Sequence, residues 1–428
     1  MNIRNFKFKM GINFKLFNFI YIIFFLEFLK PYFEYFVGSK IPFIFLYIAL
    51  IIIAIILKAT NNVLKLKFYS IDYVVILLYL IGIFYLLFST DFKTAISGFK
   101  NNFIFVYLYF FIRILNPKPE TFFKFIKFFT LFFFVVGFFG IYQYFFDYYT
   151  IALKFNFTKG TSESYFGLSQ DKYEVYNIRR AYGLYKYWTA FGYSTMMGAV
   201  FVLCLNLSEN FKKPVYNLYL IILVIAMVLS MSRTSYIAFL IGAMLTYLFY
   251  NKIPIRLIAF VGFLILIVVL IGHEISDMVL SRIFSTFSLD PSKSSSHSSY
   301  LFKNISNFFK SPFGIGLGAT ENAKEWVESA FFKFSREIGI LPVIFVSYLF
   351  FNSVITGVKL LKNQCIDKYN KVILIYSISI ISGFFIAGIN FPLWFSWFPE
   401  GIMWLLMAYV INVKENTNKM VEFKSIKL

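Results

Sequence analysis

Apolar runs of helical length alternate with short polar segments along most of the chain. A helix needs roughly 17 to 25 mainly apolar residues to cross the hydrocarbon core of a bilayer. We identify twelve such segments: Leu16–Phe36, Ile41–Leu57, Ile71–Ser89, Ala95–Leu115, Phe122–Phe146, Trp188–Leu207, Tyr216–Met231, Tyr236–Tyr250, Pro254–Gly272, Ile338–Val358, Val372–Ile389 and Gly401–Val413. The pattern therefore predicts an all-α, polytopic integral membrane protein.

Composition supports this prediction and excludes a soluble fold. Hydrophobic residues make up 59% of the 428 residues and charged residues only 14%, whereas a soluble domain is about half apolar and a quarter charged. The two cysteines, Cys204 and Cys365, lie in or beside different apolar segments, without a CxxC pattern or a nearby histidine. We therefore expect no metal site and no cofactor.

The positions of the basic residues predict the orientation. Lys and Arg favour cytoplasmic loops. With the N-terminus inside, about 23 of the 41 basic residues fall in cytoplasmic segments and about five in short outer loops. Both termini are thus expected on the cytoplasmic side of the membrane. The net charge of +20 then needs no nucleic-acid partner to explain it.

Two long polar segments divide the apolar ones, and this topology places both outside the cytoplasm. They are Asp147–Tyr187 and His273–Lys333. Loops of this length are usually functional or disordered, and their aromatic residues favour folded caps. The predicted division of the chain is helices 1 to 5 (1–146), a first loop (147–187), helices 6 to 9 (188–272), a large loop (273–333), helices 10 to 12 (334–413) and a cytoplasmic tail (414–428).

Arginines at the outer membrane surface are the first candidates for chemistry. Arg179 and Arg180 precede the sixth apolar segment, where paired guanidinium groups can bind phosphate or simply anchor the helix at the interface. Arg233 lies in the tight Met-Ser-Arg-Thr-Ser turn between two short apolar segments. Charge at that depth is costly, which favours function over a snorkelling turn residue. The neighbouring Ser and Thr are expected to cap the following helix, whose positive end attracts anions.

Two further candidates lie in or after the large loop. His297 is one of only two histidines, and a lone loop histidine is more often a solvated bystander than a functional group. Glu328 precedes the tenth apolar segment, a suitable place for a carboxylate that activates a hydroxyl, or for a helix N-terminal acid. The Pro-Phe-Gly-Ile-Gly-Leu-Gly stretch at 312–318 lacks the Gly-Lys-Ser/Thr of a P-loop, so we expect a tight bend there and no nucleotide site.

The order of these features resembles the O-antigen polymerase and ligase superfamily, which includes Wzy-type capsule polymerases. The resemblance rests on Arg180 to Gly183, the Ser-Arg-Thr turn at 232–234, the large outer loop, the 312–318 stretch and the Glu-Ser that precedes Glu-Ile-Gly at 337–339. It covers most of the chain. The ligase branch usually carries a His-Asn pair where this chain has Glu328 and Ser329, which favours a polymerase and leaves the identity of the base open.

The resemblance implies a metal-independent, inverting glycosyltransferase of the GT-C type. A glycan on undecaprenyl pyrophosphate would be transferred to the non-reducing end of a lipid-linked repeat unit. The implied pyrophosphate- and glycan-binding residues are Arg179, Arg180, Arg233, Arg282 and Arg336, and the implied proton acceptors are Glu328 and His297. Implied partners are the lipid-linked oligosaccharide, membrane lipids, and flippase and chain-length regulator proteins.

Two other functions remain open at this point. A ligase would move the same donor to a different acceptor. A flippase for lipid-linked oligosaccharides would carry charges along a central cavity, whereas in this chain the polar residues gather outside the apolar segments.

Overall fold

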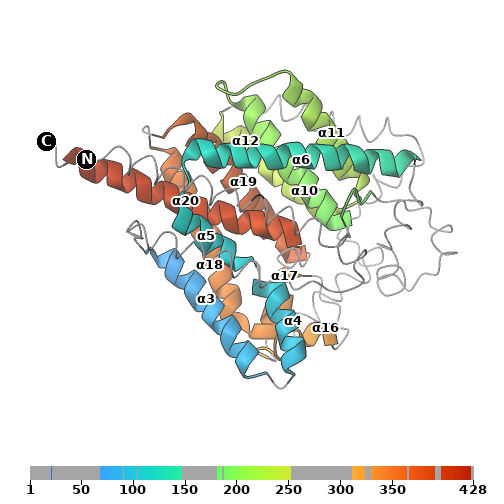
Figure 1. Cartoon of the computed structure of the whole chain (residues 1–428), viewed down its shortest axis with the longest axis vertical. Coiled ribbons are helices and arrows are strands. Elements are labelled where there is room, and N and C mark those ends of the chain that lie inside the picture. The colour runs from blue at the N-terminus through green and yellow to red at the C-terminus, as the bar shows by residue number, and fades with distance from the viewer. Residues whose placement is uncertain are drawn as a thin grey trace, which may run out of the picture.

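The computed structural model describes residues 68–89, 91–103, 105–146, 181–185, 188–251, 311–322, 329–363, 366–390 and 397–425, together with Tyr21. Within these ranges all regular structure is helical (Figure 1). The helices are α3 (Ser70–Leu87), α4 (Phe92–Phe103), α5 (Val106–Leu115), α6 (Pro119–Phe146), α10 (Trp188–Leu207), α11 (Val215–Leu229), α12 (Arg233–Phe249), α16 (Ala319–Asn322), α17 (Ala330–Ile338), α18 (Ile340–Leu361), α19 (Lys368–Asn390) and α20 (Trp397–Ser425).

Five of the described helices are long and apolar enough to cross a membrane. They are α3, α6, α10, α18 and α19, while α5, α11 and most of α12 are shorter apolar helices. The all-helical, multi-pass class is thus confirmed in its coarse form. The spans predicted at Ile41–Leu57 and Pro254–Gly272 lie outside the described residues, as does all of Leu16–Phe36 except Tyr21. The count of twelve stays a prediction.

Helix bounds agree closely with the apolar pattern at most positions and differ at three. Helix α10 has the predicted bounds at both ends, but the span predicted at Ala95–Leu115 consists of two helices, α4 and α5. The α4 sequence contains Lys93, Lys100 and two asparagines, so it is too polar to form half of a membrane span. The tenth span is preceded by a separate helix, α17, because Gly339, with φ +87°, interrupts the helical backbone between α17 and α18. Helix α20 continues beyond Val413 to Ser425.

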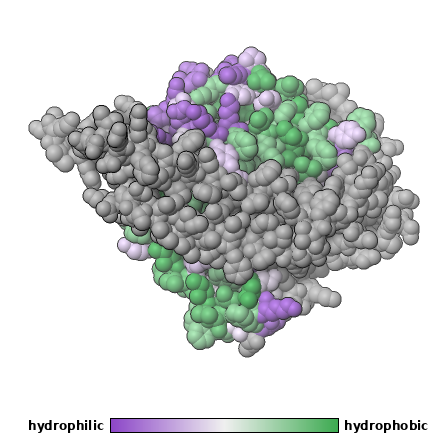
Figure 2. All heavy atoms as spheres, in the orientation of Figure 1, coloured by the Kyte–Doolittle hydropathy of each residue, from purple (hydrophilic) through white to green (hydrophobic). Residues whose placement is uncertain are grey.

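Three peripheral helices show apolar stripes at helical spacing on their exposed faces, and Figure 2 shows such an apolar surface where α3 lies in Figure 1. A stripe of this kind on a membrane protein faces lipid. The exposed residues are Tyr73, Leu77, Leu80, Phe84 and Leu87 on α3, Phe128, Leu131, Val135, Phe138 and Tyr142 on α6, and Leu341, Ile344, Tyr348, Phe351 and Ile355 on α18.

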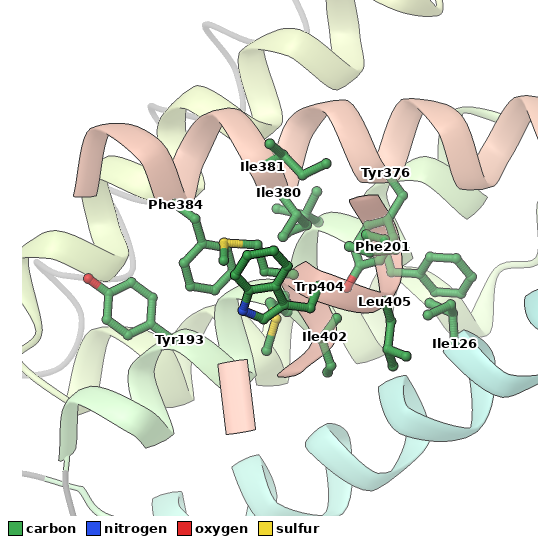
Figure 3. Packing of buried hydrophobic residues seen from close by; sticks show 14 of the residues in the cluster. Ile126, Tyr193, Phe201, Tyr376, Ile380, Ile381, Phe384, Ile402, Trp404 and Leu405 are labelled. Atoms are coloured by element: carbon green, nitrogen blue, oxygen red, sulfur yellow. The ribbon is translucent and has the colours of Figure 1, made fainter. Parts of the chain in front are cut away.

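Helix α10 lies at the centre, with 94% of its membrane-length window buried, against 28% for α3. It packs against α6, α11, α12, α19 and α20. Small residues permit this close packing: a Cβ added at Gly198 would lie 3.2 Å from Leu223 of α11 and 3.2 Å from Phe133 of α6. Aromatic and aliphatic residues of α10, α19 and α20 fill the space between these helices (Figure 3).

A buried ion network joins α3, α5 and α20. Arg113 donates from Nε to Asp72 Oδ1 at 2.8 Å and from Nη2 to Oδ2 at 3.0 Å, and its Nη1 donates to Glu415 Oε2 at 3.2 Å and to Asn412. The Tyr109 hydroxyl donates to Asp72 Oδ1 at 2.7 Å. These helix ends are the ones that the charge count assigns to the cytoplasmic side, so the network closes that end of the bundle.

The 312–318 stretch forms a tight bend, as predicted, and packs against three helices. Gly314, Gly316 and Gly318 all have positive φ, which glycine adopts without steric cost. The bend pairs with the α17–α18 junction through Ile315 N to Arg336 O at 2.8 Å, Gly316 N to Glu337 O at 3.0 Å and Ile340 N to Pro312 O at 2.9 Å. The Tyr85 hydroxyl of α3 donates to the Phe313 carbonyl.

The bend also lies directly against the backbone of α4. A Cβ added at Gly98 would come within 2.3 Å of Gly318 N. Below it, the buried Glu337 carboxylate accepts from Asn102 Nδ2 of α4 at 2.7 Å and from the Thr320 hydroxyl. We call residues 311–320, with Gly98, Asn102 and Glu337, the outer clasp, since it joins α3, α4 and α17 at the end opposite the ion network.

Replacing Arg113 by Ala is expected to destabilise the protein by about 3–5 kcal/mol, because Asp72 and Glu415 would remain buried without their cation. Thermal unfolding of the detergent-solubilised protein measures this. The matched control is Lys124→Ala, which removes the exposed Lys124–Glu120 pair and should leave the melting temperature near that of wild type. Equal effects of the two substitutions would contradict the structural role of the network.

Replacing Gly98 by Ala tests the outer clasp. The new methyl group would collide with backbone atoms of residues 317 and 318, so we expect a loss of stability of about 1–3 kcal/mol, as for overpacking. Gly137→Ala on α6 is the control, because its nearest contact would be a side-chain methyl at 3.3 Å and alanine favours helix. A Gly98→Ala protein with the wild-type melting temperature would show that the bend does not pack there.

Candidate functional site at the outer helix ends

Outer ends are those helix ends that the charge count places outside the cytoplasm. They include the C-terminal ends of α6, α11 and α19 and the N-terminal ends of α10, α12, α17 and α20. The candidate site lies among the outer ends of α6, α10, α11 and α12. It is built from the turn between α11 and α12, the segment Ala181–Tyr185 and the first turns of α10.

The α11–α12 turn, Ser230–Ser232, is held tightly by its own hydroxyl groups. Ser230 Oγ donates to Met227 O at 2.6 Å and accepts from Ser232 N at 3.2 Å, while Ser235 Oγ donates to Ser232 O at 2.7 Å. Met231 has φ +55°, which is uncommon for a residue other than glycine. Backbone strain of this kind persists where surrounding structure enforces it, often at functional sites.

Ser232 occupies the N-cap of α12, but the expected side-chain cap is absent. Its hydroxyl makes no capping hydrogen bond and lies 3.5 Å from the Thr234 hydroxyl. The positive end of the α12 dipole is therefore not neutralised by an N-cap side chain. Arg233 is the first residue of α12.

The segment Ala181–Tyr185 packs directly on this turn. Ala181 N donates to Leu229 O, the last residue of α11, at 2.8 Å. Tyr182 N donates to Gln143 Oε1 of α6 at 3.3 Å. Gly183 adopts φ +55°, and a Cβ there would lie 2.7 Å from the Phe191 ring of α10. Sequence positions nearly fifty residues apart are thus joined by a backbone hydrogen bond.

Helix α10 approaches the turn closely because position 192 is glycine. A Cβ at Gly192 would lie 2.6 Å from Ser230 Oγ and 2.9 Å from Ser235 Oγ. One residue on, the buried Tyr193 hydroxyl faces Thr234 without a hydrogen bond of normal geometry, and the adjacent Ser194 hydroxyl is likewise unpartnered in the described part. The stretches 181–185, 188–195 and 229–236 contain no acidic residue, so the site is suited to an anion.

Most residues predicted from sequence to carry chemistry lie outside the described residues. These are Arg179, Arg180, Arg282, His297 and Glu328. Ala181, which follows Arg180 in the chain, is hydrogen-bonded to the turn that leads to Arg233. The described backbone thus connects the two arginine-bearing segments. Arg336 lies on α17, where its Nη1 donates to Ser311 Oγ at 3.3 Å within the outer clasp.

The residue after Glu328 is tied to the outer end of α19. Ser329 is the N-cap of α17, and its hydroxyl donates to Gly388 O at 3.3 Å. The N-cap of this helix is therefore the serine and not the glutamate. Glu328 thus precedes a short amphipathic helix and not, as predicted, the tenth span itself.

Sequence reasoning missed two buried acids at the outer ends. Glu337 is fully buried in the outer clasp and hydrogen-bonded at both oxygens. Glu400, in the first turn of α20, is 3% exposed and accepts from Trp404 Nε1 at 3.3 Å. The available signal was an isolated acid at the edge of an apolar segment, which is by default a functional hypothesis in a membrane protein.

Metal ligands do not gather in the described part of the chain, where no group of three or more His, Cys, Asp or Glu side chains occurs. What the described residues around the α11–α12 turn offer is a set of backbone dipoles and hydroxyl groups at the N-terminus of a helix. Such an arrangement can bind an anion.

Comparison with known proteins assigns no family. No protein-family model matches the chain, and no curated protein matches it.

Proposed function

We propose that this protein is a polymerase of bacterial surface polysaccharide. It transfers a glycan chain from undecaprenyl pyrophosphate to the non-reducing end of a lipid-linked repeat unit. The protein acts as a metal-independent, inverting glycosyltransferase of the GT-C type. Its transfer site faces outward. The proposal combines the sequence resemblance with the packing of the described residues that flank Arg180 and Arg233.

The observation that carries the proposal is the hydrogen bond between Ala181 N and Leu229 O. It supports a single site formed by Arg180, the residue before Ala181, and Arg233, the first residue of α12. Arg180 adjoins a residue that is hydrogen-bonded to the last residue of α11, and Arg233 begins the next helix. Two guanidinium groups brought together at one helix N-terminus would match the charge and geometry of a pyrophosphate.

The chemistry requires charge stabilisation on the leaving group. When the bond from the sugar to pyrophosphate breaks, negative charge develops on the leaving phosphate oxygen. Fixed cations and helix dipoles aimed at that oxygen lower the barrier, and removing one such group typically costs about 10²–10³ in rate. Arg180 and Arg233 supply the cations, and Arg179, Arg282 and Arg336 contribute to binding of the pyrophosphate and glycan.

The lipid part of the substrate needs an apolar route alongside the protein. The exposed apolar stripes of α3, α6 and α18 provide lipid-facing surfaces on several sides of the bundle, so a polyprenyl chain remains in the membrane while its head reaches the outer ends. A flippase would require a polar path through the bundle. Helix α10, at the centre, contains no charged residue, which favours transfer at the outer surface over transport through the core.

Replacing Arg180 or Arg233 by Ala is expected to shorten the polymer strongly, with a loss of about 10²-fold or more in elongation rate. The measurement is the length distribution of surface glycan in cells in which the variant replaces the wild-type protein at equal membrane abundance. Single repeat units should accumulate on undecaprenyl pyrophosphate. Arg→Lys at the same positions should recover only part of the activity, because lysine lacks the planar fork.

The matched control is Lys212→Ala, an exposed basic residue at the opposite end of the bundle, which should leave polymer length unchanged. Long chains that accumulate on the lipid carrier would instead indicate a ligase. Repeat units trapped on the cytoplasmic side would indicate a flippase. Full-length polymer in both arginine variants would refute the site.

A further inference from the structure

Glu400 differs from every other buried acid in the described part of the chain. Asp72 and Glu415 share Arg113, and Glu337 has a hydrogen-bond donor at each oxygen. Glu400 Oε1 accepts from Trp404 Nε1 at 3.3 Å, but its Oε2 is buried without a hydrogen-bond partner. A buried carboxyl oxygen without a donor is costly, so its presence calls for an explanation, and binding of a ligand is one.

The surroundings of Glu400 lie at the outer ends. It sits in the first turn of α20, and α20 packs against α10 and α19. Tyr193 of α10 stacks on Phe384 of α19 with ring centroids 5.6 Å apart. In Figure 3, these two rings lie at the left of the labelled residues, and Trp404 lies to the right of Phe384. Because Glu400 precedes Trp404 by one helical turn, it lies toward the N-terminal, outer end of α20.

Unpartnered hydroxyl groups lie on the neighbouring helix. Tyr193 Oη and Ser194 Oγ of α10 are buried and without a normal hydrogen bond, and Tyr193 faces Thr234 beside the α11–α12 turn. Carboxyl and hydroxyl groups of this kind, on helices that pack together, are suited to bind the hydroxyl groups of a sugar.

We propose that Glu400 is a further catalytic residue of the transfer site, which binds the acceptor sugar through its open oxygen and takes the proton of the attacking hydroxyl. This inference rests on the proposed function. The acceptor oxygen forms a bond to C1 of the donor glycan, and the bond from C1 to the pyrophosphate oxygen breaks. The electron pair leaves with undecaprenyl pyrophosphate, and the acceptor's proton goes to Glu400 Oε2.

The deciding variant is Glu400→Gln. Its amide oxygen can still accept from Trp404 Nε1, so a structural role predicts a protein with wild-type activity. A catalytic role predicts a turnover lower by about 10²-fold or more, as for loss of a general base, with KM for the lipid-linked unit within about threefold of wild type. Purified full-length protein in lipid vesicles, supplied with undecaprenyl-pyrophosphate-linked repeat units, is assayed for elongation across a range of pH.

The pH profile separates catalysis from structure. Wild-type turnover should fall toward acid as the base becomes protonated, and this limb should be missing from the residual activity of Glu400→Gln. Glu209→Gln, at an exposed acid in the loop after α10, is the control and should match wild type. Melting temperatures of both variants verify that each is folded, and Glu400→Asp provides a second folded variant with a carboxyl group.

The outcomes are distinct. The inference is supported if the wild-type protein elongates the substrate while Glu400→Gln is folded, turns over slowly and lacks the acid limb of the pH profile. If the wild-type protein elongates the substrate and Glu400→Gln is fully active, the inference on Glu400 is overturned and the proposed function stands. The same conclusion follows if Glu328→Gln removes the acid limb of the pH profile and Glu400→Gln does not. A wild-type protein that does not elongate the substrate overturns the proposed function and this inference with it.

Discussion

The close approach of α10 to the α11–α12 turn is the constraint on which the outer end of the protein depends. A side chain at position 192 would occupy the space of two serine hydroxyls, so glycine there allows the turn, the 181–185 segment and α10 to meet. Leu229 O, just before the turn, accepts a hydrogen bond from Ala181 N. Van der Waals packing of small residues is what holds helices together when lipid removes the hydrophobic driving force between them. Such close packing suits the proposed function, because electrostatic catalysis requires groups that are held in place before the reaction.

Polar interactions then fix the two ends of the bundle in different ways. At the end that the charge count assigns to the cytoplasm, Arg113 of α5 is surrounded by partners from α3 and α20, and the described acids near it are paired. At the outer end, the clasp uses backbone contacts between glycines, and Glu337 is satisfied by neutral donors. Among the described buried acids, Glu400 is the exception, with one oxygen unpartnered. A fully satisfied network rigidifies a fold, whereas a buried carboxyl group with an oxygen left unpartnered is a candidate for ligand chemistry.

The apolar pattern predicted most described helices well, because membrane spans are defined by length and hydropathy alone. It placed α10 correctly at both ends, yet it merged α4 and α5, since a short polar helix beside an apolar one reads as one weak span. It also identified the bend at 312–318 and the turn at 230–232, where glycine, serine and arginine stand out locally. The contact of residue 181 with Leu229, the Arg113 network and the environment of Glu400 are tertiary. No spacing in the sequence reports which helices become neighbours, and isolated acids at span edges look alike until their partners are known.

The direction of chain growth tests the central claim most directly. If the growing glycan moves from its lipid onto each new lipid-linked unit, the most recent sugars lie next to the undecaprenyl pyrophosphate. A brief pulse of labelled repeat unit, followed by stepwise digestion of the polymer from its non-reducing end, should release the label last. Label released first would mean growth at the opposite end and would contradict the proposed transfer, as would polymer formation that continues when this protein is absent.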